Sequence, residues 1–420
     1  MKIKISMRNI IFIMLLNSML FGFLCAELKL PSSIYYINDL LNLVLFIAIL
    51  KTKPINKFKE YGISSILKII LCFVLFNFIG TGINLVPVQL VVWGARNTYR
   101  GLVFLIACIL YISSKDIHKI FRILYRFQIF NVLVGAYQYF VLGFIQDNVG
   151  GMFGHGNGNA LDIFCGILFA YYLLRYLNKK EKTIRLVFVL ISGIFFAVIA
   201  EEKFIFIEFF LISIIALIIT GKMSKKVVII PVIVSGVIIG VNMFQQIFPD
   251  SKELTDINKM FQYASSSWDD SYVIPRIGAF SYIYNTFFIN RPINLLFGFG
   301  MGNCDASSIN LLTSDFYRNY GQLHYRWFVH QWTFLENGIL GFTVFILIFI
   351  TILKVLIKYK IKYEEKQQLL NLSIIITLVA IITIWYNTTL KVDECYLAYF
   401  AISCGIIAIK EYNNNKEIYK

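Results

Sequence analysis

The side chains best suited to chemistry lie between residues 276 and 341, the longest interval without a membrane-like apolar segment. Two of the four histidines occur there, His324 and His330. A neutral imidazole, whose ordinary pKa lies near neutrality, can remove a proton from a hydroxyl group. His330 is favoured as this base because an apolar segment begins two residues later, and His324 is the alternative. Four arginines suit an anionic partner, because guanidinium groups bind phosphate oxygens in pairs; they are Arg276, Arg291, Arg318 and Arg326.

Aromatic residues crowd the same stretch and allow two interpretations. They could form a stacking platform for sugar rings, or they could mark the membrane interface, where tryptophan and tyrosine gather. The interfacial interpretation is favoured for Trp332. No metal site is predicted, because Asp269 and Asp270 lack partner ligands at a useful spacing. The aromatic residues in question are Tyr317, Tyr320, Tyr325, Trp327, Phe328 and Trp332.

Two shorter polar segments offer further candidates. Residues 146–162 contain five glycines and three asparagines around His155. Their backbone N–H groups could cradle a phosphate at the start of the next helix, for which Asn159 is a suitable N-cap. The alternative is a plain flexible loop. In the second segment Lys203 could bind an anion or belong to an ordinary solvated turn, whereas the deeper Glu208 must find a partner or carry a proton.

Composition sets the environment of these residues. The chain of 420 residues is 58% hydrophobic and 15% charged, with a mean hydropathy of +0.70. Soluble domains carry about 25% charged residues, so this is an integral membrane protein. The apolar runs do not alternate, which favours helices over a β-barrel. The net charge of +15 sits in short clusters between apolar runs, and nucleic acid is therefore not expected as a partner.

The hydropathy pattern predicts an all-α, polytopic membrane protein with about twelve transmembrane helices. Nine helices fill residues 1–247, a large extracytoplasmic loop occupies residues 248–331, and three helices follow in residues 332–420. The seven cysteines lie mostly inside apolar segments, so no disulfide framework is predicted. The expected spans are 9–26, 34–50, 64–84, 92–112, 123–145, 159–177, 185–200, 204–220, 227–247, 332–353, 369–389 and 394–410.

Basic residues predict the orientation. Most of the 39 lysines and arginines fall on one side of the expected helices, in clusters at 2–8, 51–68, 115–126, 175–185, 222–226, 354–366 and 410–420. The positive-inside rule makes this side cytoplasmic, so both termini are inside and the 248–331 loop is outside. Nucleotides are absent there, and the sequence has no P-loop. Any reaction in the loop must use a pre-activated or lipid-linked substrate.

The runs FINRPINLLFGFGMGN and HQWTFLENGILGFTVFI resemble the O-antigen polymerase and O-antigen ligase superfamily of bacterial surface-glycan membrane enzymes. The GMFGHGNGNAL run, which opens the sixth expected span, resembles a second stretch of that family. Lys203 stands where many members have an arginine. The matching positions are Arg276, Pro292, Gly298, Gly300, Gly302, His330, Glu336, Gly338 and Gly341.

The resemblance implies glycosyl transfer without a cofactor or metal, on the outer face of a bacterial cytoplasmic membrane. The donor would be a polyprenyl-diphosphate-linked glycan, His330 the base, and Arg276, Arg291, Lys203, Gly298, Gly300, Gly302 and Glu336 the binding residues. Membrane lipid and a chain-length regulator protein are the other expected partners. Polymerisation of O-antigen, capsule or exopolysaccharide repeat units is favoured over ligation of finished glycan to lipid A-core. A lipid-linked glycan or polysaccharide transporter is the alternative from another class.

Overall fold

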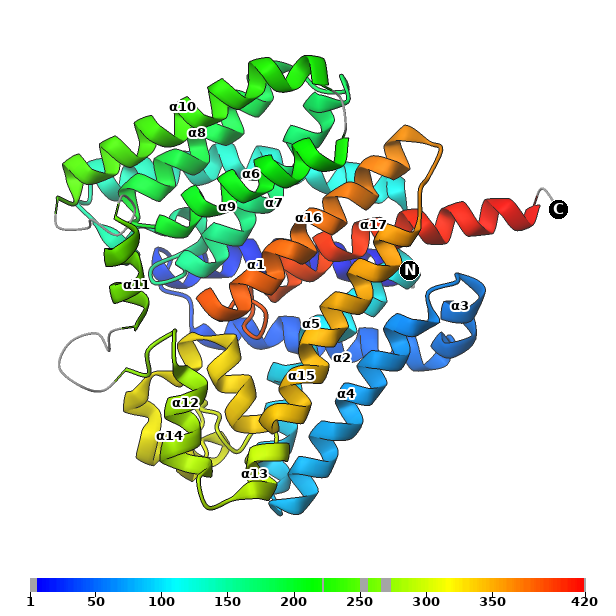
Figure 1. The fold of residues 1–420 in the computed structure, drawn as a ribbon, viewed down its shortest axis with the longest axis vertical. Coiled ribbons are helices and arrows are strands. Elements are labelled where there is room, and N and C mark those ends of the chain that lie inside the picture. The colour runs from blue at the N-terminus through cyan, green and yellow to red at the C-terminus, as the bar shows by residue number, and fades with distance from the viewer. Residues whose placement is uncertain (1–5, 221–222, 250–255, 266–272, 419–420) are drawn as a thin grey trace.

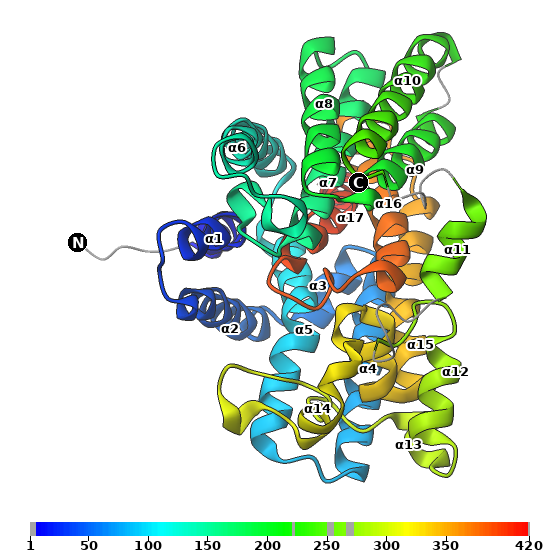
Figure 2. The same cartoon turned by 90° about the vertical axis from the view of Figure 1, so that its left-hand side faces the viewer.

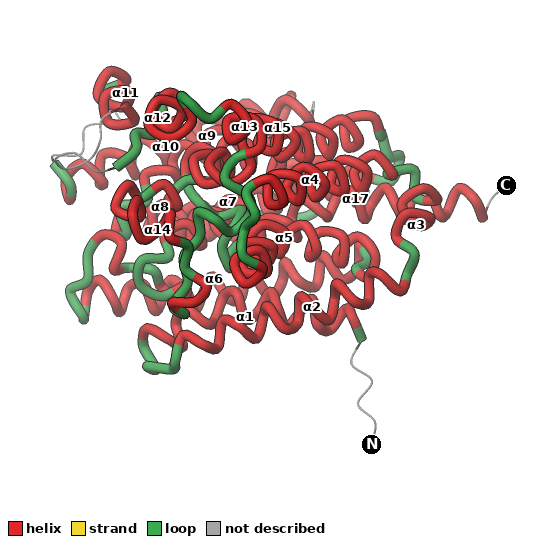
Figure 3. The backbone as a smooth tube through the Cα atoms, turned by 90° about the horizontal axis from the view of Figure 1, so that it is seen from below, coloured by secondary structure: helices red, strands yellow, loops and turns green. Residues whose placement is uncertain are grey.

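The computed structural model describes residues 6–220, 223–249, 256–265 and 273–418, and the regular elements among them are all helical (Figure 3). Asp269 and Asp270 lie outside this part of the chain. The α-helices are α1 (Met7–Ala26), α2 (Tyr36–Lys51), α3 (Pro54–Glu60), α4 (Ser64–Ile83), α5 (Val88–Tyr111), α6 (Ser114–Phe140), α7 (Gly158–Leu177), α8 (Thr183–Ile199), α9 (Lys203–Thr220), α10 (Met223–Ile247), α11 (Ile257–Ser265), α12 (Ala279–Ile283), α13 (Pro292–Phe297), α14 (Asp315–Tyr320), α15 (Val329–Lys358), α16 (Glu364–Tyr386) and α17 (Cys395–Ile418).

The expected helical membrane fold is confirmed, because the predicted apolar segments form helices. Each of the twelve expected spans coincides with a helix. In the described part of the chain, eight segments are long and apolar enough to cross a membrane: α1, residues 32–51 including α2, α4, α7, α9, α15, α16 and the first part of α17. Among the other four, α5 carries Arg96 and Arg100, and α8 has only 17 residues.

The helices form two groups with a shared centre. In both Figure 1 and Figure 2, α8 and α10 lie at the top, whereas α4 and α13 lie at the bottom. Between them, α16 packs against α7, α15 and α17, and α17 also packs against α5. Most of α7 and the membrane-length part of α17 is buried. The centre of the fold is therefore protein-lined, which allows polar side chains to persist within apolar helices.

The described residues between α10 and α15 form a cap of short helices at one end of the bundle. Figure 1 shows α11 at the left and α12 and α14 below it at the lower left, whereas α3 and the C-terminus lie at the right. Contacts at the right-hand end include ion pairs of Arg8 with Asp116 at 3.6 Å and of Lys366 with Glu411 at 3.3 Å. The cap covers the start of α15, where His330 is located.

A break inside α15 anchors the cap. Gly338 adopts φ 62° and ψ −167°, a conformation that interrupts the helix and that side chains other than glycine rarely adopt. The turn after α13 fits against this break: Phe299 N–H donates to the Leu335 carbonyl at 2.8 Å, and Gly300 N–H donates to the Glu336 carbonyl at 2.9 Å. The break thus supplies carbonyl acceptors that a continuous helix would use internally.

Candidate functional site

His330 lies in the first turn of α15 and is fully buried. Its Nδ1 is 3.1 Å from the Ile384 carbonyl oxygen of α16. A carbonyl only accepts hydrogen bonds, so Nδ1 carries the proton and Nε2 of the neutral ring presents a lone pair. Nε2 has no partner in good hydrogen-bond geometry among the described residues, and the backbone of Arg276 also lies beside the ring. The ring packs edge-on against Phe280 and face to face near Trp385. The imidazole is therefore oriented as a base.

Arg276 shares these surroundings. Its guanidinium group lies over the ring of Phe328 at 4.9 Å and over the ring of Tyr386 at 4.8 Å. Phe328 also packs against the His330 ring, with centroids 5.8 Å apart. Two ring faces of this kind attract a cation and hold its plane. The fold thus brings the predicted arginine and the predicted base together, although 54 residues separate them in the sequence.

The other candidates from the cap lie elsewhere. His324 adopts a left-handed conformation and stacks on the exposed Trp327, with ring centroids 4.0 Å apart. Arg291 is exposed near the start of α13, with its guanidinium 6.0 Å from the Phe299 ring. Neither residue has a recorded contact with His330. Of the two histidines, His330 is the one with a buried environment, whereas His324 stacks on an exposed ring.

Glu336 forms an ion pair with Lys391, whose Nζ lies 3.0 Å from Oε2. Both side chains are buried, and Oε1 of Glu336 accepts a hydrogen bond from Gly302 N–H at 3.0 Å. Lys391 also lies 3.9 Å from the ring centroid of Trp332, which is itself buried. The interfacial interpretation of Trp332 is therefore wrong, because this indole is buried and packs against a cationic side chain inside the protein. Glu336 joins the cap turn, α15 and the segment before α17.

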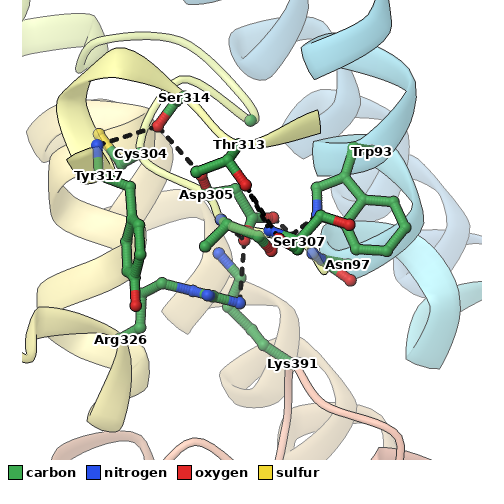
Figure 4. A network of polar contacts seen from close by, with 12 residues as sticks. Trp93, Asn97, Cys304, Asp305, Ser307, Thr313, Ser314, Tyr317, Arg326 and Lys391 are labelled. Atoms are coloured by element: carbon green, nitrogen blue, oxygen red, sulfur yellow. Dashed lines mark hydrogen bonds and ion pairs between the residues drawn. The ribbon is translucent and has the colours of Figure 1, made fainter. Parts of the chain in front are cut away.

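A second set of polar contacts continues from Trp332 to α5, and Figure 4 shows its central part. Arg326 lies over the same indole at 4.6 Å, and its Nη2 is 3.0 Å from Oδ1 of the buried Asp305. The amide of Asn97 donates to the other oxygen of Asp305. The hydroxyl of Ser314 donates to the Asp305 backbone carbonyl at 3.0 Å. The side chain and backbone of Asp305 thus hold the cap onto α5.

Along α5 the network includes two arginines. Arg96 and Arg100 both donate to Oδ1 of Asn97, at 2.7 and 2.6 Å. Arg100 also pairs with Asp393, and Arg96 Nη2 lies 2.7 Å from Asp39 of α2. Sequence reasoning did not assign these two arginines to the site. Their spacing of four residues, which places both on one helix face, was the available signal.

The glycine-rich turn has its N–H groups occupied. Phe299 and Gly300 donate to α15 carbonyls, Met301 donates to Thr81 Oγ1 at 3.1 Å, and Gly302 donates to Glu336. Gly298, Gly300 and Gly302 all have positive φ, between 73° and 90°. A Cβ at Gly298 would overlap the backbone of Glu336. In this conformation these glycines permit close packing and do not present free donors to a phosphate.

Backbone N–H groups of the 146–162 segment also donate hydrogen bonds to other parts of the protein. Gly151 N–H donates to Gln138 Oε1 at 2.8 Å, and Met152 N–H donates to Asn131 Oδ1 at 2.7 Å. His155 Nδ1 is 2.6 Å from the Asn148 carbonyl oxygen. Asn159 is the second residue of α7, not its N-cap, a position that belongs to Asn157. The predicted second anion site therefore corresponds to a loop packed against α1 and α6.

Lys203 begins α9, and its Nζ lies 3.2 Å from Oε1 of Glu201. The next residue, Phe204, stacks on Tyr386 with centroids 4.1 Å apart. Tyr386 is also one of the two rings that hold Arg276. The start of α9 thus lies near the Arg276 site, because Tyr386 contacts both Phe204 and Arg276.

The arrangement combines a buried imidazole with a lone pair at Nε2, a stacked guanidinium beside it, and an adjacent network of paired charges. Such a pair can accept a proton and stabilise negative charge in one place. Among the described residues, no group of three or more His, Cys, Asp or Glu side chains is arranged to hold a metal ion. Comparison with known proteins finds no family model that matches this chain and no curated protein that matches it.

Proposed function

We propose that the chain is a membrane glycosyltransferase of the O-antigen polymerase type. It would join repeat units carried on polyprenyl diphosphate at the outer face of a bacterial cytoplasmic membrane. The observation that carries the proposal is the meeting of Arg276 and His330 around Phe328. These were the cation and the base expected from the sequence, and their proximity supports a shared role.

In this proposal His330 acts through Nε2. The acceptor sugar hydroxyl gives its proton to Nε2 while its oxygen attacks the anomeric carbon of the donor. The bond from that carbon to the diphosphate oxygen breaks, and the lipid diphosphate leaves with the electron pair. The Ile384 carbonyl, 3.1 Å from Nδ1, keeps the ring in the required tautomer and stabilises the imidazolium that forms.

Arg276 stabilises the negative charge that develops on the leaving diphosphate. A guanidinium group keeps its charge at any working pH and binds two phosphate oxygens at once. The rings of Phe328 and Tyr386 hold its plane before substrate arrives, which lowers the cost of reorganisation during the reaction. Arg291 and Lys203 remain candidates for the more distant parts of the donor.

Access requires a side chain to move, because the His330 ring is 0% exposed. Trp385 is the covering ring with the greatest freedom, since it packs near His330 and is 39% exposed. Rotation of the Trp385 indole would expose the His330 ring to the outer surface. The same closure excludes water from the donor, which favours transfer to a sugar over hydrolysis.

All twelve helices cross the membrane in this proposal, with both termini in the cytoplasm. Contacts between charged residues support this orientation, because they join residues assigned to the same side. Arg8 pairs with Asp116 at one end, whereas Arg96 pairs with Asp39 at the other. Hydrogen bonds within a protein-lined centre explain how α5 can retain two arginines.

The test is the length distribution of surface glycan in a deletion strain that carries variants of this gene. We expect His330→Ala to abolish long chains and leave single repeat units on the core. His330→Asn keeps a donor for the Ile384 carbonyl but lacks a base, and it should fail equally. His324→Ala should retain long chains, and immunoblots of membranes should show equal amounts of each variant.

The outcomes separate the alternatives. Intact chain lengths in His330→Ala, His324→Ala and the double variant would show that neither histidine is the base. Accumulation of unattached, lipid-linked polymer in the deletion strain would indicate the ligase reaction. Single repeat units on the core would support polymerisation.

A further inference from the structure

Three carboxyl side chains follow one face of α7 away from the proposed reaction site. Gly158, Asp162 and Gly166 are spaced by four residues, so they lie on the same face and about 6 Å apart along the axis. The carboxyl group of Glu202 occupies the space above Gly158, and that of Glu208 occupies the space above Gly166. Side chains from the start of α9 and the turn before it thus alternate with Asp162 in a row that runs into the bundle.

The two inner carboxyls have no counter-charge in contact. Glu208 is 0% exposed and Asp162 is 1% exposed. Both oxygen atoms of Glu208 lack a hydrogen-bond partner among the described residues, whereas Asp162 has the carboxyl group of Glu202 beside it. An ionised carboxylate in such surroundings is costly, whereas the neutral acid is tolerated. The burial of Glu208 is thus a second observation, independent of the clustering, that points to a bound cation or proton.

The neighbouring groups are mostly acidic. Glu202 is adjacent to Asp162, and Asp147 and Glu201 also face it. Burial and Asp162 raise the pKa of the Glu202 carboxyl well above its usual range. The Cys165 thiol is next to Glu208 and Asp162, and Gln128 approaches that thiol at 4.0 Å. The nearest cation is Lys203, whose ammonium group lies against Glu201 at 3.2 Å.

We propose that Asp162, Glu202 and Glu208 form a proton-binding site that is loaded from the outer surface. Glu202 is partly exposed and receives the proton, and Asp162 passes it to Glu208. A proton fits better than a metal ion, because the carboxyl groups follow one another along α7 and, among the described residues, no three or more His, Cys, Asp or Glu side chains are arranged to hold a metal ion. Hard cations require several oxygen ligands. The proposal does not depend on the glycosyl transfer proposed above.

Infrared difference spectroscopy tests the site in the full-length protein reconstituted in lipid nanodiscs. The wild-type protein should show the C=O stretch of protonated carboxyl groups at neutral pH, shifted by exchange into D₂O or by ¹³C-labelling of Glu. Glu208→Gln and Asp162→Asn should each remove part of this band. Glu181→Gln is the matched control, because that carboxylate is largely buried but pairs with Arg185 at 2.8 Å, and it should leave the band unchanged.

The wild-type spectrum can overturn the proposal even if a variant fails to fold. Absence of a protonated carboxyl band at neutral pH overturns it. Persistence of the full band in Asp162→Asn, Glu202→Gln and Glu208→Gln also overturns it, because the protons would then lie elsewhere. Loss of the wild-type band on addition of Na⁺ or Mg²⁺ at constant pH would identify a metal-ion site instead. Loss on raising the pH, with no effect of either ion, supports proton binding.

Discussion

Lys391 Nζ lies 3.0 Å from Oε2 of Glu336, and this buried pair connects the segment before α17 to the broken helix α15. The same carboxylate holds Gly302 N–H through its other oxygen, and the same ammonium group lies over Trp332. Each charged group therefore has several partners, which is the condition under which a buried ion pair is tolerated. The pair fixes the cap to the helix that carries His330.

Removal of one partner of this pair should destabilise the protein strongly. Lys391→Ala leaves Glu336 buried without its counter-charge, and we expect a loss of about 3–5 kcal/mol in the free energy of unfolding. The double variant Lys391→Met with Glu336→Leu removes both charges and should recover part of this loss. Lys366→Ala is the control, because its pair with Glu411 is partly exposed and should contribute at most about 1 kcal/mol. Denaturant unfolding in detergent measures all three, and equal losses for Lys391→Ala and Lys366→Ala would contradict the prediction.

The stacked position of Arg276 predicts a graded loss of transfer activity. Arg276→Ala should lower the rate by about 10²–10³-fold if the guanidinium stabilises the leaving diphosphate. Arg276→Lys keeps the charge but loses the planar group that fits between Phe328 and Tyr386, and its rate should be intermediate. Incorporation of lipid-linked repeat units in proteoliposomes provides the rate. Arg318→Ala, which changes an exposed arginine paired with Asp315, is the control. Similar rates for Arg276→Ala and Arg318→Ala would remove Arg276 from the mechanism.

The tight packing of the turn after α13 predicts that a methyl group added there lowers stability more than one added at an open glycine. Gly298→Ala introduces a left-handed alanine and also forces its Cβ into the backbone of Glu336. Gly143→Ala meets the first cost alone, because Gly143 has φ 69° and open space around it. We expect about 1–2 kcal/mol for Gly143→Ala and roughly 1–3 kcal/mol more for Gly298→Ala from overpacking. Thermal unfolding compares them, and equal values would show that the turn does not pack tightly against α15.

The helices could be predicted from the sequence because each one satisfies its own backbone hydrogen bonds. Apolar runs of about 20 residues in a chain with few charges leave little choice but helix. Residues 80–98 are apolar, but Gly and Pro interrupt this segment. It forms the end of α4, a turn and the start of α5. Local composition was thus sufficient to predict the helices. Pro87 disfavours a helical conformation in the residue before it, which marks the boundary between α4 and α5.

The pairing of side chains could not be predicted, because it depends on which distant loops meet. Glu336 and Lys391 are 55 residues apart, and Asn97 and Asp305 are 208 residues apart. The sequence around Asp305 and Lys391 does not distinguish them from residues of a solvated loop. The family resemblance assigned the glycines after Phe297 to substrate binding, whereas in the structure the break in α15 accepts hydrogen bonds from N–H groups of this turn. Only the folded chain shows that this acceptor exists.

The raised pKa of the Glu394 carboxyl predicts that the free energy of unfolding falls as the pH rises towards neutrality. Burial, with a smaller contribution from Asp393, raises the pKa of this carboxyl from 4.5 to about 7. Below pH 4.5 the group is protonated in both the folded and the unfolded chain and costs nothing. Between pH 4.5 and about 7 the folded chain binds more protons, so the free energy of unfolding decreases as the pH rises. Glu394→Gln, which cannot ionise, should lose this part of the pH dependence.

Thermal unfolding of the purified protein between pH 4.5 and pH 8 measures the effect. The difference between wild type and Glu394→Gln should grow with pH and level off above about pH 7, with the variant the more stable protein there. Glu365→Gln removes an exposed carboxylate at the opposite end of the bundle and controls for the loss of one negative charge. If Glu394→Gln instead loses stability at high pH, the carboxylate must be stabilised by its neighbour Arg100, and the charged network would then extend one residue further along the chain.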